Sequence, residues 1–186
     1  EDGATHQCVE DLALMRVIPG MTVVNPCDGA EMRAAVQALI DYDGPAYLRL
    51  GRSAVETVTE YESGKHTFQL GKGVTLREGK DVTIVATGMM VQLALQAAEL
   101  LAAEGIDARV LDIHTVKPLD TELILKAAKE TGAIVTSEEH SVIGGLGGAV
   151  AEFLSGHCPV PVIRHGVKDV FGRSGKAAEV LEAYGL

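Results

Sequence analysis

Two short polar segments, EDGATHQ at residues 1–7 and LGRS at residues 50–53, carry the side chains best suited to chemistry. Asp2 can accept hydrogen bonds from hydroxyl groups, and His6 can donate or accept a proton near neutral pH. Arg52 presents a planar set of N–H donors that fits an anion such as phosphate. Together these groups are typical of a site for a hydroxylated, phosphorylated substrate.

Three predicted elements must position these groups. MTVVN at residues 21–25 predicts a buried strand, and PAYLRLG at residues 45–51 predicts a second strand whose C-terminal end delivers Arg52 into a loop. Between them, Asp28 is suited to cap a helix, and Glu31 follows at the spacing of an acidic capping box. Two strands and one helix bury too little apolar surface to form a stable sheet. We therefore expect the front of this domain to lie outside the sequence.

A second unit follows a polar linker at residues 53–66. Predicted strands and helices then alternate in the order DVTIVAT, a helix at about 89–104, DARVLDI, a helix at about 120–131, AIVTSEE, a helix near 146–154, PVPVIRH and a final helix. Gly105 and Gly132 stand where left-handed helix caps would fall. This alternation predicts an α/β fold with parallel strands and crossover helices, complete in itself.

The glycine-rich GGLGG at residues 144–148 could cradle a phosphate, but its spacing is not GxGxxG and no P-loop lysine follows. We interpret it as tight strand-to-helix packing. Ser174, in GRSG, is placed to cap the last helix.

The segment EEHS places Glu138, Glu139 and His140 at the C-terminal end of a predicted strand. Consecutive side chains of a strand point to alternate sides, so the three are no metal cluster, and we interpret His140 as a satisfied interface histidine. His114 also ends a strand and is interpreted as a structural or subunit-contact residue.

Composition excludes several classes of protein. The chain of 186 residues is 47% hydrophobic and 23% charged, as in a soluble globule, and its formal charge of −10 argues against nucleic acid as the main partner. Three scattered cysteines, without CxxC spacing, predict neither disulfides nor a thiolate metal site and favour a reducing, cytoplasmic compartment. The longest apolar stretch is interrupted by polar residues, so we expect no membrane anchor.

Several stretches together resemble one known family. These are EDGATHQ, IPGMTVVNPCDGAEMRAAV, GPAYLRLGR, GKDVTIVATGMMVQLALQAAELLAAEGIDARVLDIHTVKPLD and EEHSVIGGLGGAVAE. They look like the C-terminal half of a transketolase, and the ending GVKDVFGRSGKAAEVLEAYGL is similar to that of the C-terminal subunit of split, two-chain transketolases. The likeness covers essentially the whole chain.

The resemblance implies an α/β chain that begins in the pyrimidine-binding domain of a thiamine diphosphate enzyme, at residues 1–60. A linker and a Rossmann-like transketolase C-terminal domain follow at residues 61–186. By this likeness Asp2 and His6 would contact the hydroxyls and carbonyl of a sugar, with His6 as the catalytic proton-transfer group, and Arg52 would hold the substrate phosphate.

The resemblance also implies thiamine diphosphate and Mg2+ in the complete enzyme. The family's activating glutamate and ring-packing aromatic residues have no match in this chain, and the magnesium site lies on another domain, so no cofactor-binding residue or metal ligand is assigned. We expect no cofactor to bind this chain alone. The implied partners are an N-terminal transketolase subunit or domain, sugar phosphates and a second copy in a homodimer, with contacts around the His114 and His140 loops.

The sequence departs from the family pattern at two positions, and three alternatives to the transketolase interpretation remain open. Arg173 replaces the family's usual glutamate, which we expect to alter a surface or subunit contact, and Ala4 replaces a frequent proline, which predicts a more flexible loop. The alternatives are 1-deoxyxylulose-5-phosphate synthase, the β subunit of a 2-oxo acid dehydrogenase, and a non-catalytic assembly or ligand-binding module when the chain is isolated.

Overall fold

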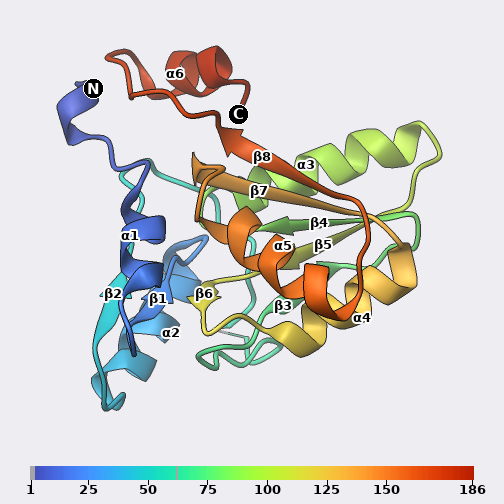
Figure 1. The fold of residues 1–186 in the computed structure, drawn as a ribbon, viewed down its shortest axis with the longest axis horizontal. Coiled ribbons are helices and arrows are strands. Elements are labelled where there is room, and N and C mark those ends of the chain that lie inside the picture. Colours follow the sequence, from blue (N-terminus) through green and yellow to red (C-terminus); the bar gives the residue numbers. More distant parts are fainter. Residues whose placement is uncertain (1–2, 62) are drawn as a thin grey trace.

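The computed structural model describes residues 3–61 and 63–186 and contains two sheets with helices around them (Figure 1). The helices are η1 (Ala4–His6), α1 (Asp11–Val17), α2 (Gly29–Ile40), α3 (Met90–Ala103), α4 (Thr121–Thr131), α5 (Leu146–His157) and α6 (Ala177–Tyr184). The strands are β1 (Thr22–Val24), β2 (Ala46–Leu48), β3 (Val74–Arg77), β4 (Val82–Ala86), β5 (Ala108–Asp112), β6 (Thr115–Lys117), β7 (Ile134–Ser141) and β8 (Val162–Val167).

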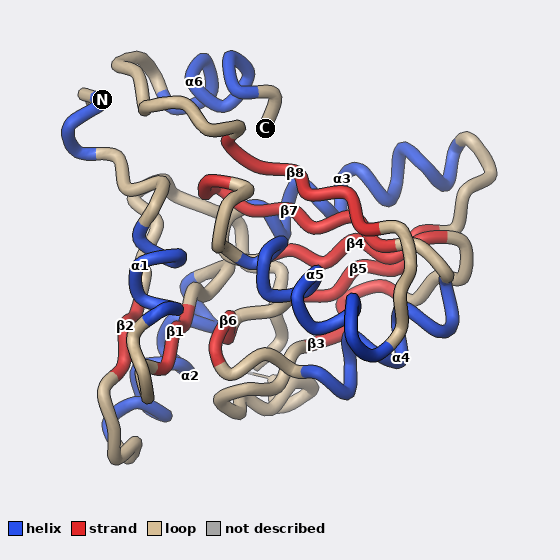
Figure 2. The backbone as a smooth tube through the Cα atoms, viewed as in Figure 1, coloured by secondary structure: helices blue, strands red, loops and turns tan. Residues whose placement is uncertain are grey.

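The larger sheet has the strand order β3-β5-β4-β7-β8 (Figure 2). Strands β5, β4, β7 and β8 are parallel, and β3 pairs antiparallel with β5 at one edge. The chain leaves β4 toward β5 and later returns to its other side as β7, so the strand order reverses between β4 and β7. Ligands of open α/β sheets bind beyond the carboxyl ends of the strands at such a reversal.

The two faces of this sheet are buried by different helices, because side chains alternate along each strand. Val85 and Leu111 face the core formed with α4 and α5, whereas Ile84 and Val110 face the core formed with α3. Both faces are thus covered by helices, which is why these strands are almost continuously apolar. The predicted α/β class, with its parallel strands and crossover helices, is confirmed.

The smaller sheet has the order β2-β1-β6, and it draws its strands from both units. β1 pairs parallel with β2, and it pairs antiparallel with β6, which follows β5 in the second unit. The first unit contributes only two strands to this sheet. The third strand and the buried Leu12 of α1 complete a core that those two strands and α2 could not form.

Most of the helix caps predicted from the sequence are present in the structure. The Asp28 carboxylate accepts a hydrogen bond from the Glu31 N–H at 2.8 Å, and Gly105 and Gly132 adopt the left-handed conformation with φ of 84° and 69°. The predicted cap of the last helix is wrong: α6 has Lys176 at its N-cap and no side-chain cap, because the Ser174 hydroxyl instead accepts from the Ala4 N–H at 3.4 Å. In the described part of the chain, no helix is both long enough and apolar enough to cross a membrane.

Candidate functional site

The first polar segment ends in a single 3₁₀ turn that carries His6. The His6 N–H donates to the carbonyl of Gly3 at 2.9 Å, and its Nδ1 atom lies 3.1 Å from the hydroxyl of Thr5. Arg52 lies in the loop that follows β2, as the sequence predicts. Asp2 lies outside the described residues, so its predicted role stays a prediction.

His6 and Arg52 line the same pocket, which has a volume of about 440 Å³. They come from segments far apart in sequence, and both are exposed in the part of the chain described. The pocket also receives Met89 from the loop after β4 and Glu139 from β7. It therefore lies at the strand reversal of the larger sheet, where open α/β sheets bind ligands.

The C-terminal segment supplies a wall that the sequence did not predict. Val180, Leu181 and Tyr184 of α6 line the pocket together with the polar loops. The N-terminal and C-terminal segments lie side by side in Figure 1, in dark blue and red. Hence the pocket combines an apolar wall with a few convergent polar groups, the usual make-up of a small-molecule site.

Contacts of Gln7 with Gly172 and Arg173 hold these two segments together. The Gln7 side-chain amide donates to the Arg173 carbonyl at 2.9 Å. A Cβ atom at Gly172 would collide with the Gln7 Oε1 atom, so a larger residue there would have to displace the Gln7 amide from this contact. The Arg173 guanidinium lies 5.2 Å from the centre of the Tyr184 ring, so this departure from the family pattern makes an intrachain cation–π contact.

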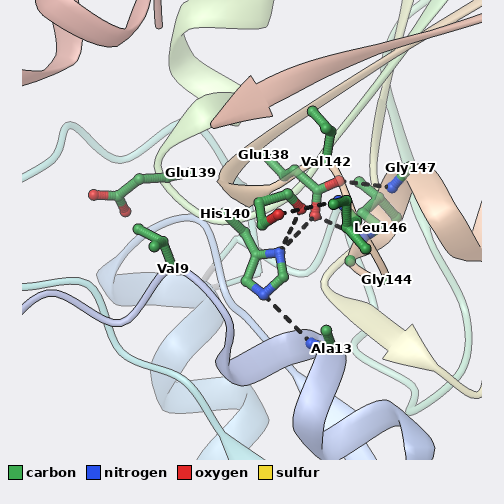
Figure 3. A network of polar contacts seen from close by, with 12 residues as sticks. Val9, Ala13, Glu138, Glu139, His140, Val142, Gly144, Leu146 and Gly147 are labelled. Carbon is green, nitrogen blue, oxygen red and sulfur yellow. Dashed lines mark hydrogen bonds and ion pairs between the residues drawn. The ribbon is translucent and has the colours of Figure 1, made fainter. Parts of the chain in front are cut away.

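The side chains of Glu138, Glu139 and His140 point to alternate sides of β7, as expected for consecutive residues of a strand (Figure 3). Glu138 and His140 are fully buried on one side of β7, and Glu139 points away from them, half-buried, toward the pocket. The Glu138 carboxylate accepts from the N–H groups of Leu146 and Gly147 at 2.7 and 2.8 Å, at the start of α5. GGLGG therefore packs against the strand, as predicted, and a side chain already fills the helix N-terminus.

Opposing influences act on the Glu138 carboxyl. Burial raises its pKa to about 7, while the two backbone N–H donors of α5 oppose the shift. The Nδ1 atom of His140 lies 3.7 Å from the carboxylate, and burial lowers the pKa of this histidine. The histidine is satisfied at an interface between α1 and β7, as predicted.

The side chains of His114 and His140 are both fully buried within the chain. The subunit contacts expected around their loops stay a prediction. The ring of His114 stacks on Phe68 with centroids 4.2 Å apart, and its Nδ1 atom lies 2.9 Å from the Thr115 hydroxyl. Burial lowers the pKa of His114. Of the two predicted roles for His114, the structural one inside the chain is the one observed.

Among the described residues, Cys27, Glu31 and Asp112 form a buried group whose ligand atoms lie within 4.8 Å of one another. Sequence spacing could not reveal it, because Asp112 comes from the second unit. The Cys27 thiol donates to Asp112 at 3.4 Å, and Glu31 accepts from the Cys27 N–H at 2.7 Å and from the Tyr61 hydroxyl at 2.9 Å.

Burial raises the pKa of both Cys27 and Asp112, so the thiol stays protonated at neutral pH and the charged form of Asp112 is disfavoured. The group therefore forms a hydrogen-bonded contact between the units. Mg2+ prefers several oxygen ligands gathered around one point. Among the described residues, those lining the pocket include no group of three such side chains, so no metal ligand is assigned to them.

Comparison with known families finds two matching profiles. Residues 1–57 match the pyrimidine-binding domain of transketolase, and residues 71–186 match the transketolase C-terminal domain. Among solved structures, a protein described as a split gene transketolase, inactive beta4 tetramer, superimposes with a TM-score of 0.94 at 54% identity. That alignment covers 99% of this chain and 59% of the solved chain.

Curated relatives include a 6-deoxy-6-sulfo-D-fructose transketolase subunit from Clostridium sp. (strain MSTE9), 52% identical over 100% of this chain and 56% of its own. An apulose-4-phosphate transketolase subunit from Phocaeicola vulgatus is 48% identical over 99% of this chain and 58% of its own. A 1-deoxy-D-xylulose-5-phosphate synthase from Heliobacterium modesticaldum is 43% identical over 100% of this chain and 29% of its own. The chain thus spans little more than half the length of the two transketolase subunits.

Proposed function

The chain belongs to the transketolase family, and from this membership we propose that it is the C-terminal portion of an enzyme that transfers a two-carbon ketol unit between sugar phosphates. The observation that carries the proposal is the shared pocket of His6 and Arg52. An imidazole and a guanidinium around one pocket suit a substrate that is hydroxylated at one end and phosphorylated at the other.

Each residue has a distinct proposed role. Arg52 binds the substrate phosphate through its planar N–H donors and fixes the orientation of the sugar. His6 donates a hydrogen bond to the sugar oxygen that gains negative charge, and it exchanges a proton there. Asp2 accepts hydrogen bonds from sugar hydroxyls. The apolar wall formed by Leu181 and Tyr184 excludes water from one side of the pocket.

The remaining parts of the complete enzyme are also proposals. Thiamine diphosphate and Mg2+ supply the carbanion chemistry when bound, and an N-terminal transketolase subunit or domain provides their ligands. Residues 1–60 form the end of the pyrimidine-binding domain, and residues 61–186 form the linker and the C-terminal domain, a division that the family profiles support. We further propose a cytoplasmic homodimer of the assembled enzyme.

The test is transfer activity in the enzyme assembled with its N-terminal subunit. We expect steady transfer from xylulose 5-phosphate to ribose 5-phosphate. Omitting thiamine diphosphate or the N-terminal subunit should abolish the transfer, and the isolated chain should bind no cofactor in calorimetry. Micromolar cofactor binding by the isolated chain would contradict the proposed division of labour.

A second candidate is 1-deoxyxylulose-5-phosphate synthase, which is favoured by the 43% identity to a synthase of that name. The two functions differ in the donor substrate. Consumption of pyruvate in place of the ketose donor would replace the transketolase proposal by the synthase, or by a 2-oxo acid dehydrogenase if glyceraldehyde 3-phosphate were not needed. Absence of both reactions would leave a non-catalytic assembly module.

A further inference from the structure

Arg49 adjoins the second polar segment of the pocket and contacts Cys8, which follows the first, and the proposed ketol transfer assigns it no part in binding or catalysis. It immediately follows β2, three residues before Arg52, and its backbone N–H donates to the Val24 carbonyl at 2.8 Å. Its side chain is only 12% exposed and lines the same pocket as His6 and Arg52. The guanidinium is therefore held inside the pocket wall.

The Arg49 guanidinium directs its donors to the protein. Its Nε atom donates to the Asp11 carboxylate at 2.9 Å, and its Nη2 atom donates to the carbonyls of Cys8 at 2.7 Å and Glu139 at 3.0 Å. The Nη1 atom lies 3.8 Å from the Glu139 carboxylate. With these contacts, few of its five N–H groups are left for a substrate.

These contacts join three separate parts of the chain. Cys8 comes two residues after His6, Asp11 begins α1, and Glu139 lies near the carboxyl end of β7. Arg49 itself belongs to the segment that carries Arg52. One planar cation thus connects both polar segments of the pocket to the end of the larger sheet.

Asp11 is held in place for this contact. The Tyr47 hydroxyl donates to the same Asp11 oxygen at 2.7 Å. Burial and the Asp11 carboxylate raise the pKa of Tyr47 to about 12, so its hydroxyl remains a donor. The counter-ion of Arg49 is thus fixed by a strand residue that precedes it by two positions.

We propose that Arg49 is a positioning residue: it sets the distance and orientation of the His6 loop relative to Arg52, without binding the substrate. The inference rests on the proposed ketol transfer for its catalytic consequence. A displacement of about 1 Å between a proton-transfer group and its substrate can cost about 100-fold in rate. The charge-assisted hydrogen bonds of Arg49 are suited to preventing such a displacement of His6.

The test compares Arg49→Ala and Arg49→Lys in the assembled enzyme. For Arg49→Ala we expect a fall in kcat of about 10- to 100-fold with a KM for the phosphorylated substrate that changes less than about threefold. Arg49→Lys should be intermediate, because one ammonium cannot reproduce the fork of contacts. Added guanidinium at millimolar concentration should restore part of the Arg49→Ala activity. A rise in KM alone would make Arg49 a substrate ligand and overturn the proposal.

Arg16→Ala is the matched control. Arg16 donates to the carbonyls of Gly144 and Gly145 and pairs with Glu152 at 2.8 Å, so it joins α1 to the region of α5. It does not line the pocket. We expect Arg16→Ala to lower stability while kcat stays within about twofold of wild type. Equal kcat losses in both variants would mean that Arg49 acts only through general stability.

Hydrogen–deuterium exchange separates this proposal from the proposed function. Exchange of residues 3–10 should rise in Arg49→Ala, or in Arg49→Lys if the alanine variant does not fold, and should stay unchanged in Arg16→Ala. If the wild-type assembly transfers no ketol unit but the exchange rises, the function fails and the positioning of the loop stands. If activity is present and neither kcat nor exchange responds to the Arg49 variants, the positioning role fails alone.

Discussion

His140 accepts a hydrogen bond from the backbone N–H of Ala13 through its Nε2 atom, at 3.3 Å, and so joins β7 to α1. Its Nδ1–H group donates to the Ser141 carbonyl at 2.7 Å. One ring nitrogen must therefore carry a proton and the other must not, which fixes a neutral imidazole. Protonation of Nε2 would place two donors against each other in a buried site.

The neutral state of His140 predicts a loss of stability in acid. Its pKa is lowered in the folded protein by burial, whereas an unfolded histidine takes up a proton near its ordinary pKa of about 6.5. The free energy of unfolding should thus fall as pH drops below about 6.5. In His140→Gln the loss between pH 7.5 and 5.5, measured by urea unfolding, should be smaller by on the order of 1 kcal/mol. Equal losses in variant and wild type would show that His140 does not titrate in this way.

The neighbouring Glu138 predicts a pH dependence of the opposite sign. Its pKa is raised to about 7 in the folded protein, so the folded state holds a proton that the unfolded state releases near pH 4.5. The contribution of this group to stability therefore declines between about pH 4.5 and 7, by on the order of 2–3 kcal/mol. Glu138→Gln should lack this decline in urea unfolding from pH 5 to 8. A decline as steep as in wild type would contradict the raised pKa.

Two adjacent glycines in α5 should respond differently to alanine. A Cβ at Gly147 would lie 2.6 Å from the Thr136 Oγ1 atom and 2.8 Å from the Arg164 Cγ atom. Gly147→Ala should therefore lower the free energy of unfolding by about 1–3 kcal/mol through overpacking.

Gly148→Ala is the control for that change. Its nearest neighbour is the end of the flexible Arg16 side chain at 3.4 Å, and alanine is the better helix former by about 1 kcal/mol. We expect this variant to be as stable as wild type or slightly more stable in urea unfolding. The close packing of GGLGG against β7 would be refuted if both variants lost stability equally.

Arg52→Ala should separate phosphate binding from the rest of the reaction. In the assembled enzyme we expect the KM for phosphorylated sugars to rise about tenfold or more, because a charge-assisted contact to phosphate is lost. An unphosphorylated aldehyde acceptor should show no such increase. Steady-state kinetics with both acceptors tests this, and an unchanged KM for the phosphorylated one would remove Arg52 from the site.

The elements of the larger sheet could be predicted because their signals are local. The periodic pattern of α4 and the apolar runs of β4 and β5 place these elements within one or two residues of where they lie. The short α1 and the three-residue β6 could not be predicted in this way. Both are stabilised by packing against distant parts of the chain, and a few residues carry too little periodicity to indicate them.

The candidate site was predictable in part, for a similar reason. His6 and Arg52 have side chains whose chemistry is evident from the sequence, and the structure brings them to one pocket. The wall provided by Tyr184 and the contacts of Arg49 depend on which distant segments meet, and local sequence does not specify this. The buried contact between Cys27 and Asp112 escaped prediction because the two residues come from different units, far apart in sequence.

The antiparallel pairing of β1 with β6 has a consequence for recombining this chain with its relatives. The linker at residues 53–66 looks like the natural joint for a chimaera, yet a crossover there would set β1 of one parent against β6 of the other. A crossover after Pro118 would keep both strands from a single parent, but it would set β4 of one parent against β7 of the other. The two sheets therefore tie residues 22–167 into one exchange block, and a chimaera that takes this whole block from one parent should fold more often than one joined at the linker.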